Sequence, residues 1–374
     1  MQGFGWGGSE ELWYVSALKA VDDGFKVFVA WFGDKTKDHK QLTILANKGI
    51  KIIYLGPEVY KNDSFVIRVK RKLTKQEGIP EVINRFSFIE ELNPDKILVN
   101  ASTAVSLVHY SDLTTWMLNT QFKFNVLIHH HFENGMFTSL NRQSLELILN
   151  RAKINFIVAW RNLQVLERQI LIKIPNVKLV QNPINVNNPQ IVPWPESNVL
   201  QIAVVARLDC NFKGQDILIQ ALADSSWKDI HFNVNLYGKG PDEEYIRSLI
   251  DLYQLQERVF LKGYRTEIPS IWQENHILML PSISEGTPIS LVEAMGCGRS
   301  AIVTDVGDNA RLINDNVNGF VSDGCSVNSL NKVLRRSISK KEEWKSMGEK
   351  AFIDFKDFNS QDPAKTFLEL LIAD

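Results

Sequence analysis

Short runs of β-branched and other apolar residues alternate along most of the chain with longer stretches in which an apolar residue recurs every three or four positions. A short apolar run predicts a buried strand, and the longer spacing predicts an amphipathic helix. Their regular alternation indicates an α/β fold with parallel sheets. The predicted strands cover residues 27–31, 52–55, 96–99, 126–128, 155–158, 201–205, 233–237, 259–261, 277–280 and 301–304.

Turn-forming residues interrupt the alternation near the middle of the chain. Asn and Pro recur between Gln181 and Pro189, and Pro193-Trp194-Pro195 follows. Because single cores rarely grow beyond about 250 to 300 residues, we expect two domains in a chain of 374 residues. The first domain is predicted at residues 1–190 and the second at residues 191–356. A helix is predicted over residues 363–371, and the segment 357–374 that contains it is a candidate to pack back on the first domain.

Both domains are expected to be doubly wound and to bind ligands at the carboxyl ends of their strands. If these two edges face each other, they can hold a substrate in a central cleft.

Composition narrows the class of protein. Apolar residues make up 44% of the chain and charged residues 23%, and no apolar run approaches the roughly 20 residues that span a bilayer. The first residues lack the basic and apolar regions of a signal peptide, so we expect a cytoplasmic protein. A formal net charge of −1 argues against nucleic acid as a partner. The basic stretch at residues 68–75 suits either weak contact with anionic lipid at the inner face of the membrane or a solvated face.

Two glutamates carry most of the functional information. Glu285 and Glu293 lie in Ser284-Glu285-Gly286-Thr287-Pro288-Ile289-Ser290-Leu291-Val292-Glu293. Thr287 is the predicted N-cap of a helix and Pro288 its first residue, which leaves Glu285 in the preceding loop and Glu293 on a buried or ligand-facing side. The helix N-terminus favours an anion, and the carboxylates accept hydrogen bonds from sugar hydroxyls. A phosphorylated sugar fits both.

Two cations follow the first strand of the second half. Arg207 and Lys213 lie six residues apart, between that strand and the next helical stretch, where they could clamp a diphosphate. The alternative is a surface pair of cations.

Glycine-rich turns follow other strands. The segment Gly3-Phe4-Gly5-Trp6-Gly7-Gly8 fits G-x-G-x-x-G but has almost no chain for a preceding strand, so a dehydrogenase is not supported. Gly7-Gly8 remains either a phosphate-approaching helix start or a structural turn. Tyr237-Gly238-Lys239-Gly240 lacks the spacing of a Walker loop. The turn at Gly263-Tyr264-Arg265 could present backbone groups to a nucleobase.

Three histidines end a strand of the first half. Consecutive side chains on a strand alternate in direction, so His129, His130 and His131 cannot all bind one zinc ion. Two interpretations stay open: one of the three imidazoles bonds a substrate hydroxyl, or the histidine at the strand end is structural. Cys210, Cys297 and Cys325 are too widely spaced for a disulfide framework or a metal site and are expected to be buried. Without an Asp-x-Asp pair, a leaving diphosphate has to be stabilised by protein cations and helix dipoles.

Taken in order, these segments resemble the retaining glycosyltransferases of family four, which have the GT-B fold of two Rossmann-like domains facing a cleft. The likeness runs from Gly7 to about Val321. Its matching pieces are the glycine loop, Asn182-Pro183-Ile184, Arg207 with Lys213-Gly214, Tyr237-Gly238-Lys239-Gly240, Leu261-Lys262-Gly263, and Pro281-Ser282 leading into Glu285 and Glu293.

The resemblance implies roles for these residues. Glu293 would hold the ribose hydroxyls, Glu285 the hydroxyls of the donor sugar, and Arg207 with Lys213 the β-phosphate. His131, or His130 as second choice, would contact the donor sugar. The other donor contacts would come from Gly7, Gly8, Gly263, Tyr264, Arg265, Gly286, Thr287, Pro288, Ile289, Ser290 and Leu291.

The resemblance also implies the reaction. A hexose, best assigned as glucose from UDP-glucose, would pass to a saccharide or lipid-linked saccharide acceptor in surface polysaccharide synthesis, with retention and without a metal or cofactor. The alternatives are a GDP-mannose-dependent enzyme, a nucleotide-sugar epimerase and a catalytically idle sugar-nucleotide-binding protein.

The chain departs from the family in two places. The usual strand before the glycine loop has no room after Met1, so either the start was assigned late or the first sheet lacks that strand, which would expose backbone groups. Asp308-Asn309-Ala310 replaces the usual glycine and glutamate, and no donor contact is assigned there.

Overall fold

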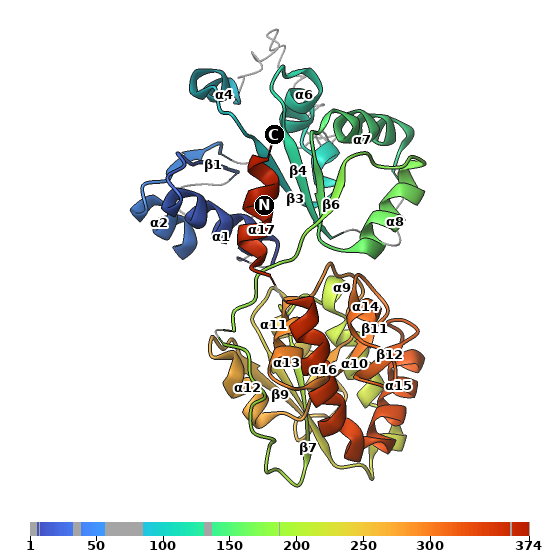
Figure 1. Ribbon diagram of the computed structural model, residues 1–374. Coiled ribbons are helices and arrows are strands. Elements are labelled where there is room, and N and C mark those ends of the chain that lie inside the picture. The colour runs from blue at the N-terminus through green and yellow to red at the C-terminus, as the bar shows by residue number, and fades with distance from the viewer. Residues whose placement is uncertain are drawn as a thin grey trace. The chain divides into compact units, whose positions relative to one another are not determined.

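The computed structural model describes residues 6, 8–32, 39–56, 85–130, 137–186, 188–359 and 361–373. The chain divides into two compact units. The N-terminal unit comprises Met1–Val158, Asn162–Gln181 and Ala364–Asp374, and the C-terminal unit comprises Ala159–Arg161 and Asn182–Pro363. Both are built from parallel strands and helices (Figure 1), which confirms the predicted α/β class. Gly7, His131 and the basic stretch 68–75 lie outside the described residues.

The C-terminal unit is a doubly wound sheet of six parallel strands in the order β12-β11-β10-β7-β8-β9. Its elements are β7 (Leu200–Val205), α9 (Cys210–Lys213), α10 (Gln215–Leu222), η2 (Ser225–Trp227), β8 (Phe232–Tyr237), α11 (Glu243–Leu252), β9 (Val259–Gly263), α12 (Ile268–Glu274), β10 (Ile277–Leu280), α13 (Ile289–Gly296), β11 (Ser300–Thr304), α14 (Asn309–Leu312), β12 (Gly319–Ser322), α15 (Val327–Ser339), η3 (Lys341–Glu343) and α16 (Trp344–Phe358).

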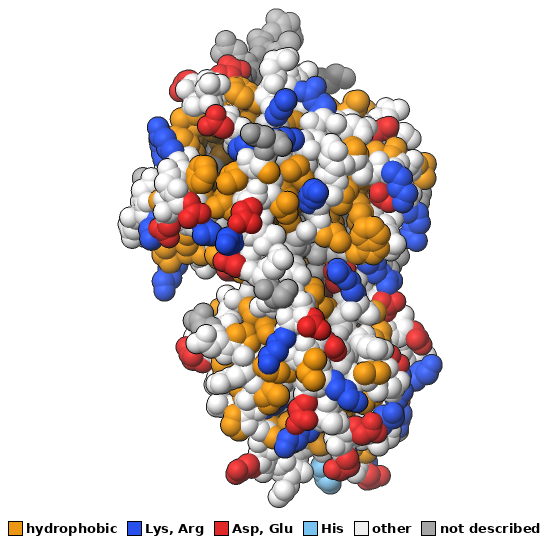
Figure 2. Space-filling model, in the orientation of Figure 1, with side chains coloured by type: hydrophobic (Ala, Val, Ile, Leu, Met, Phe, Trp, Pro, Cys, Tyr) orange, Lys and Arg blue, Asp and Glu red, His pale blue; other side chains and the backbone are white. Residues whose placement is uncertain are grey.

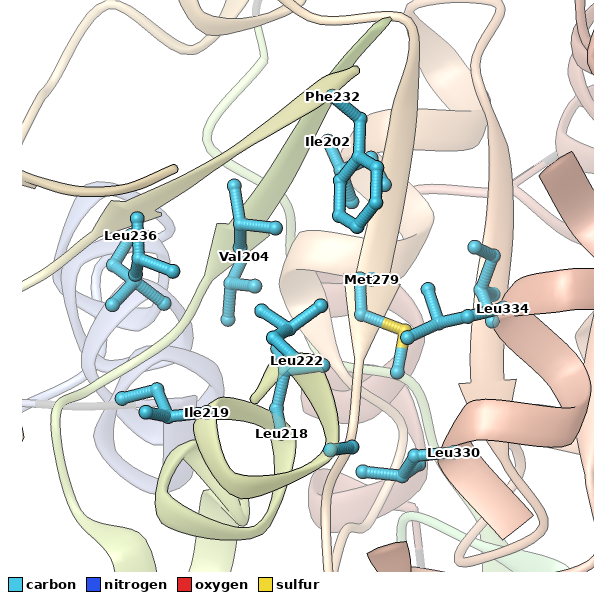
Figure 3. Close-up of a cluster of buried hydrophobic side chains, with 14 of the residues drawn as sticks. Ile202, Val204, Leu218, Ile219, Leu222, Phe232, Leu236, Met279, Leu330 and Leu334 are labelled. Carbon is cyan, nitrogen blue, oxygen red and sulfur yellow. The ribbon is translucent and has the colours of Figure 1, made fainter. Parts of the chain in front are cut away.

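Alternate side chains of each strand fill two separate cores in this unit. Ile202 and Val204 of β7 pack with α10 and α15 on one face (Figure 3), in a cluster that also includes residues of α11. Ala203 packs with α12 and α13 on the other face. Neighbouring strands follow the same rule, because successive side chains of a strand point to opposite faces. The sheet is therefore buried on both sides, as parallel sheets require.

The N-terminal unit has two sheets, β1-β2 and β3-β4-β5-β6. Its elements are α1 (Gly8–Asp22), β1 (Phe28–Trp31), α2 (Lys40–Asn47), β2 (Lys51–Tyr54), α4 (Ser87–Leu92), β3 (Leu98–Thr103), α5 (Ser106–His109), α6 (Ser111–Asn119), β4 (Asn125–His130), α7 (Ser139–Arg151), β5 (Asn155–Ile157), α8 (Trp160–Ile170), β6 (Val177–Leu179) and α17 (Pro363–Ile372).

Helix α1 contacts both of these sheets. Leu12 belongs to the cluster formed with β4 and β5, and Trp13 packs with Val29 and Trp31 of β1. Within the described residues no strand precedes α1. The two sheets are thus held by side-chain packing on a shared helix.

The final helix, α17, packs in the N-terminal unit. The ring of Phe367 lies 4.9 Å from that of Phe156 in β5, and the hydroxyl of Ser16 donates to the carbonyl of Ala364. Residues 357 and 358 still belong to α16 of the C-terminal unit. The part of the segment 357–374 that lies with the N-terminal unit is therefore Ala364–Asp374.

The junction in the middle of the chain falls between Gln181 and Asn182, earlier than residue 190. Residues 182–190 belong to the C-terminal unit because Val186 is buried in its core, and because the N–H of Asn185 donates to Glu293.

On the visible face of the C-terminal unit, acidic and basic side chains are interspersed (Figure 2). None of the helices in the described part of the chain combines the length and apolar composition needed to cross a bilayer.

Candidate functional site

The topology of the C-terminal unit brings two of the predicted clusters together. Strands β7 and β10 are neighbours, and Ile202 pairs with Ile277. From β7 the chain continues to β8 and β9 on one side, and from β10 it continues to β11 and β12 on the other. The loops after β7 and β10 therefore diverge at a topological switch point, where open α/β sheets bind their ligands.

Backbone contacts fix these two loops to each other. The N–H groups of Ile283 and Ser284 donate to the carbonyl of Phe212 at 2.9 and 3.2 Å. Gly214 ends α9 with φ +61°, and a Cβ there would lie 2.2 Å from the carbonyl oxygen of Pro281. Only glycine fits this conformation and this approach.

The contact places Lys213 against the first glutamate of the pair. Its ammonium nitrogen lies 2.7 Å from Oε1 of Glu285, which also accepts from the hydroxyl of Ser282 at 2.7 Å. Glu285 is 7% exposed and the Lys213 side chain 23%. Lys213 and Glu285 therefore form an ion pair next to solvent. The ammonium group can bind an anionic group of a ligand there, and the carboxylate can accept hydrogen bonds from its hydroxyls.

Arg207 follows β7, and its side chain is 32% exposed. One terminal nitrogen, Nη2, lies 3.7 Å from Oδ2 of Asp209, and the Arg207 carbonyl accepts from Nε2 of Gln215 at 2.7 Å. Burial raises the pKa of Asp209, and the charge of Arg207 partly opposes this rise. Each of the two predicted clamp cations therefore has a carboxylate beside it.

The helix after Glu285 begins later than predicted. Pro288 is the N-cap, and α13 starts at Ile289, so the assignment of Thr287 as N-cap and Pro288 as first helical residue is wrong. The Thr287 hydroxyl donates instead to Oδ2 of Asp308 at 3.3 Å, and the N–H of Asp308 donates to the Gly286 carbonyl. The loop is thus supported by the segment after β11.

Glu293 lies on α13 and is 3% exposed, as the buried option predicted. Its Oε1 accepts from the N–H of Asn185 at 3.0 Å. Ser290 and Leu291 lie in the first turn of the same helix, whose N-terminus carries partial positive charge.

The last candidate donor contacts of this unit lie in the turn after β9. Gly263 is the last residue of β9, and Tyr264 is 67% exposed. Nη1 of Arg265 donates to Oε1 of Glu274 at 2.8 Å, and its guanidinium carbon lies 5.2 Å from the centre of the Tyr237 ring.

Most of the C-terminal unit matches the model of a known protein family. Residues 190–353 match the family model described as "Glycosyl transferases group 1". A poly(ribitol-phosphate) alpha-N-acetylglucosaminyltransferase of Staphylococcus aureus is 26% identical over 57% of this chain and 43% of its own length. An Escherichia coli enzyme, UDP-Gal:alpha-D-GlcNAc-diphosphoundecaprenol alpha-1,3-galactosyltransferase, is 25% identical over 38% of this chain and 34% of its own. The matches thus span less than half the length of these curated relatives.

The fold has a full-length counterpart. The crystal structure of Anabaena HepE in complex with UDP and glucose has a TM-score of 0.70 to this chain at 18% identity, and covers 97% of this chain and 94% of its own. The chain has the GT-B fold, and its residues 190–353 match the group 1 glycosyltransferase model.

The remaining candidates of this GT-B chain lie in its N-terminal unit. Gly8 is the first residue of α1, and the carbonyl of Ser9 accepts from Nδ2 of Asn100. Oδ1 of the same asparagine lies 2.7 Å from Nε2 of His129, which is 3% exposed. His130 is half-buried at the end of β4. His129 therefore has a structural partner, and His130 is the described histidine that remains a donor-sugar candidate.

Sequence reasoning missed three groups that support this site. Asp209 stands beside Arg207, Asp308 holds the loop before α13, and Glu274 binds Arg265. Asp209 lies two residues from Arg207, so a search for acids near each predicted cation could have found it. The other two lie far from their partners in sequence, and only the fold brings them close.

Other reactive groups in the unit are structural. Burial raises the pKa of Cys210, Cys297 and Cys325 to about 12, so these thiols are neutral near pH 7. Within the described residues, no three His, Cys, Asp or Glu side chains gather as a metal site would need.

Proposed function

We propose that the chain is a retaining glycosyltransferase that moves a hexose from a nucleotide diphosphate to a saccharide or lipid-linked saccharide acceptor in cell-surface polysaccharide synthesis. UDP-glucose is the proposed donor, and GDP-mannose is the alternative. The observation that carries the proposal is the contact of Lys213 with Glu285, whose Oε1 also accepts from the Ser282 hydroxyl, at the switch point of the sheet. A UDP-sugar and a polyprenol-linked acceptor are named for the Escherichia coli relative, and UDP with glucose for the Anabaena structure.

The proposed chemistry uses the cations of the C-terminal unit. Arg207 and Lys213 neutralise the charge that develops on the leaving diphosphate, and the N-terminus of α13 adds its partial charge. Glu285 positions the sugar hydroxyls, with His130 or His131 as a further contact. The acceptor hydroxyl attacks the donor sugar from the face that the diphosphate leaves, and the departing phosphate oxygen takes the proton of that hydroxyl. No protein nucleophile is then needed.

The proposed place of action is the cytoplasm, at the inner face of the membrane where a lipid-linked acceptor would be presented. Weak contact through the basic stretch 68–75 is part of this proposal.

Transfer itself is the test. The native protein and Arg207→Ala are incubated with UDP-glucose and with GDP-mannose, each with a panel of saccharide and polyprenyl-linked acceptors. We expect UDP release and an α-linked product from the native protein with UDP-glucose. Release of neither nucleotide diphosphate with any acceptor would contradict the proposal and favour a catalytically idle nucleotide-binding protein.

Glu293→Ala is expected to weaken UDP binding by about 10- to 100-fold, because charge-assisted hydrogen bonds to the ribose hydroxyls are each worth about 1.5 to 3 kcal/mol. Calorimetric titration measures the change. Glu293→Gln is the matched control, since its amide oxygen can still accept from the N–H of Asn185. Unchanged affinity in the alanine variant would remove the ribose assignment.

Chelation is expected to leave transfer unaffected. Because Arg207 and Lys213 supply the positive charge at the proposed diphosphate site, initial rates with and without excess EDTA should agree. A rate abolished by EDTA and restored by Mn²⁺ would instead require a divalent ion in the reaction.

A further inference from the structure

The turn after β8 lies against the loop that carries Arg207. The N–H of Ala206 donates to the carbonyl of Tyr237 at 3.1 Å, and the N–H of Leu208 donates to the carbonyl of Lys239 at 3.2 Å. The peptide group between Arg207 and Leu208 is therefore bonded directly to Lys239. The backbones of Arg207 and Lys239 are thus neighbours at the carboxyl ends of β7 and β8.

Two glycines allow this close approach. A Cβ on Gly238, which has φ +150°, would lie 2.0 Å from the carbonyl oxygen of Ala206, and a Cβ on Gly240 would lie 2.1 Å from that of Leu208. Any other residue at either position would push the turn away from the loop. Lys239 therefore supplies the side chain of Gly238-Lys239-Gly240, and that side chain is exposed.

Lys239 differs from the other candidate cations of this edge of the sheet, because each of those has a carboxylate partner. The pairs are Arg207 with Asp209 at 3.7 Å, Lys213 with Glu285 at 2.7 Å and Arg265 with Glu274 at 2.8 Å. Within the described part of the chain, Lys239 forms no ion pair. The nearest acid in sequence, Asp242, accepts instead from the N–H of Cys210 at 2.7 Å. The exposed ammonium group is therefore available to an anion that a ligand brings.

Two neighbouring cations repel each other when no ligand is bound. Like charges on adjacent strands are destabilising, and the ion pairs above leave the charge of Lys239 uncompensated. An anionic oxygen close to Arg207 and Lys239 would remove this repulsion and accept charge-assisted hydrogen bonds from both. Phosphate suits this place, because its oxygens can bind the fork of an arginine and the point charge of a lysine together.

The order of the strands indicates which phosphate this is. In the sheet, β10, β7, β8 and β9 follow one another, and adjacent strands lie about 4.8 Å apart. The proposed function assigns the donor's hexose to the loop after β10, its β-phosphate to the loop after β7 and its base to the turn after β9. Along the donor, the α-phosphate comes between the β-phosphate and the nucleoside. It therefore falls to the loop after β8, which carries Lys239.

We infer that Lys239 binds the α-phosphate of the nucleotide donor, next to the β-phosphate held by Arg207 and Lys213. This inference rests on the proposed function, which assigns no side-chain cation to the α-phosphate. A nucleoside monophosphate, which carries the α-phosphate alone, should then bind through Lys239.

Uridine, UMP and UDP separate the contributions of the two phosphates. Their dissociation constants are measured by calorimetry for UDP and by ligand-observed NMR titration for UMP and uridine. The proteins are the native chain, Lys239→Met, Lys239→Arg and Arg207→Ala. Lys228→Met is the matched control, since it removes an exposed lysine that precedes the same strand, β8, at its other end.

We expect Lys239→Met to weaken the binding of UMP and of UDP by a similar factor of about tenfold, the effect of losing one charge-assisted hydrogen bond, and to leave uridine binding unchanged. Lys239→Arg keeps the charge and should retain most of the UMP affinity. Arg207→Ala should weaken UDP binding more than UMP binding, and Lys228→Met should change none of the three affinities.

Native UMP affinity in Lys239→Met, or a loss confined to UDP, would overturn the inference alone. An equal loss for uridine would also overturn it, because the side chain would then act on the fold of the turn rather than on a phosphate. A native protein that binds UDP but not UMP would remove the α-phosphate site and leave the proposed function standing. A native protein that binds none of the three ligands would overturn the proposed function and the inference with it.

Discussion

Replacing Lys213 with methionine is expected to lower kcat/KM for sugar transfer by about 10²- to 10³-fold, the usual effect of removing one preorganised donor to a developing oxyanion. Methionine keeps much of the length of the side chain and removes the ammonium group that lies 2.7 Å from Glu285. Glu285, which is 7% exposed, would then keep the Ser282 hydroxyl but lose its cation. Steady-state rates with the donor and a competent acceptor measure the loss.

Binding of UDP and of uridine separates two explanations for such a loss. If Lys213 neutralises the diphosphate, the variant should lose affinity for UDP and keep its affinity for uridine, which has no phosphate. Equal losses for both ligands would mean that the substitution disturbs the loop, and unchanged UDP affinity with unchanged turnover would contradict the clamp. Lys213→Arg keeps the charge with a different donor geometry, so its UDP affinity should lie between those of the native protein and Lys213→Met.

Arg299→Met is expected to destabilise the C-terminal unit by at least about 3 kcal/mol, because several buried carbonyls lose a donor and each acceptor left without one costs about 1 to 3 kcal/mol. Arg299 is 1% exposed. Its guanidinium donates to backbone carbonyls of the described residues, those of Val192, Pro193, Trp272, Asn275, Cys297 and Gly298. Burial lowers its pKa to about 10, so it stays charged near pH 7.

These contacts hold the segment around Pro193 to α12 and β11, so their loss should lower the free energy of unfolding of the whole unit. Urea unfolding followed by circular dichroism measures the change in free energy of unfolding. Arg247→Met, at a side chain that is 62% exposed, should stay within about 0.5 kcal/mol of the native protein. An Arg299→Met protein with the native unfolding midpoint would show that the carbonyls find other donors.

The sequence predicts most of the strands because their apolar runs reflect burial on both faces of a sheet. Each predicted strand overlaps an observed one. Among the described residues, two strands were missed: β6 (Val177–Leu179) is a three-residue edge strand with two exposed side chains, and β12 (Gly319–Ser322), although mostly buried, begins at a glycine and has an apolar run of only two residues.

The candidate site was predictable where its residues stand close together in the chain. Glu285 and Glu293 flank one helix start, and Arg207 and Lys213 bracket one loop, so spacing alone groups them. The contact between Lys213 and Glu285 was not predictable from spacing, because it joins residues 72 positions apart. Thr287 was misassigned for the same reason: Asp308, 21 residues away, takes its hydroxyl.

Calorimetric titration of the native protein and of Arg207→Ala with UDP and with GDP, all in EDTA, measures whether the chain binds a nucleotide diphosphate through Arg207. We expect UDP to bind more tightly than GDP without a metal, and Arg207→Ala to lose at least tenfold in UDP affinity, equivalent to about 1.4 kcal/mol. Absence of binding to either nucleotide, or equal UDP affinity in the native protein and the variant, would contradict this expectation.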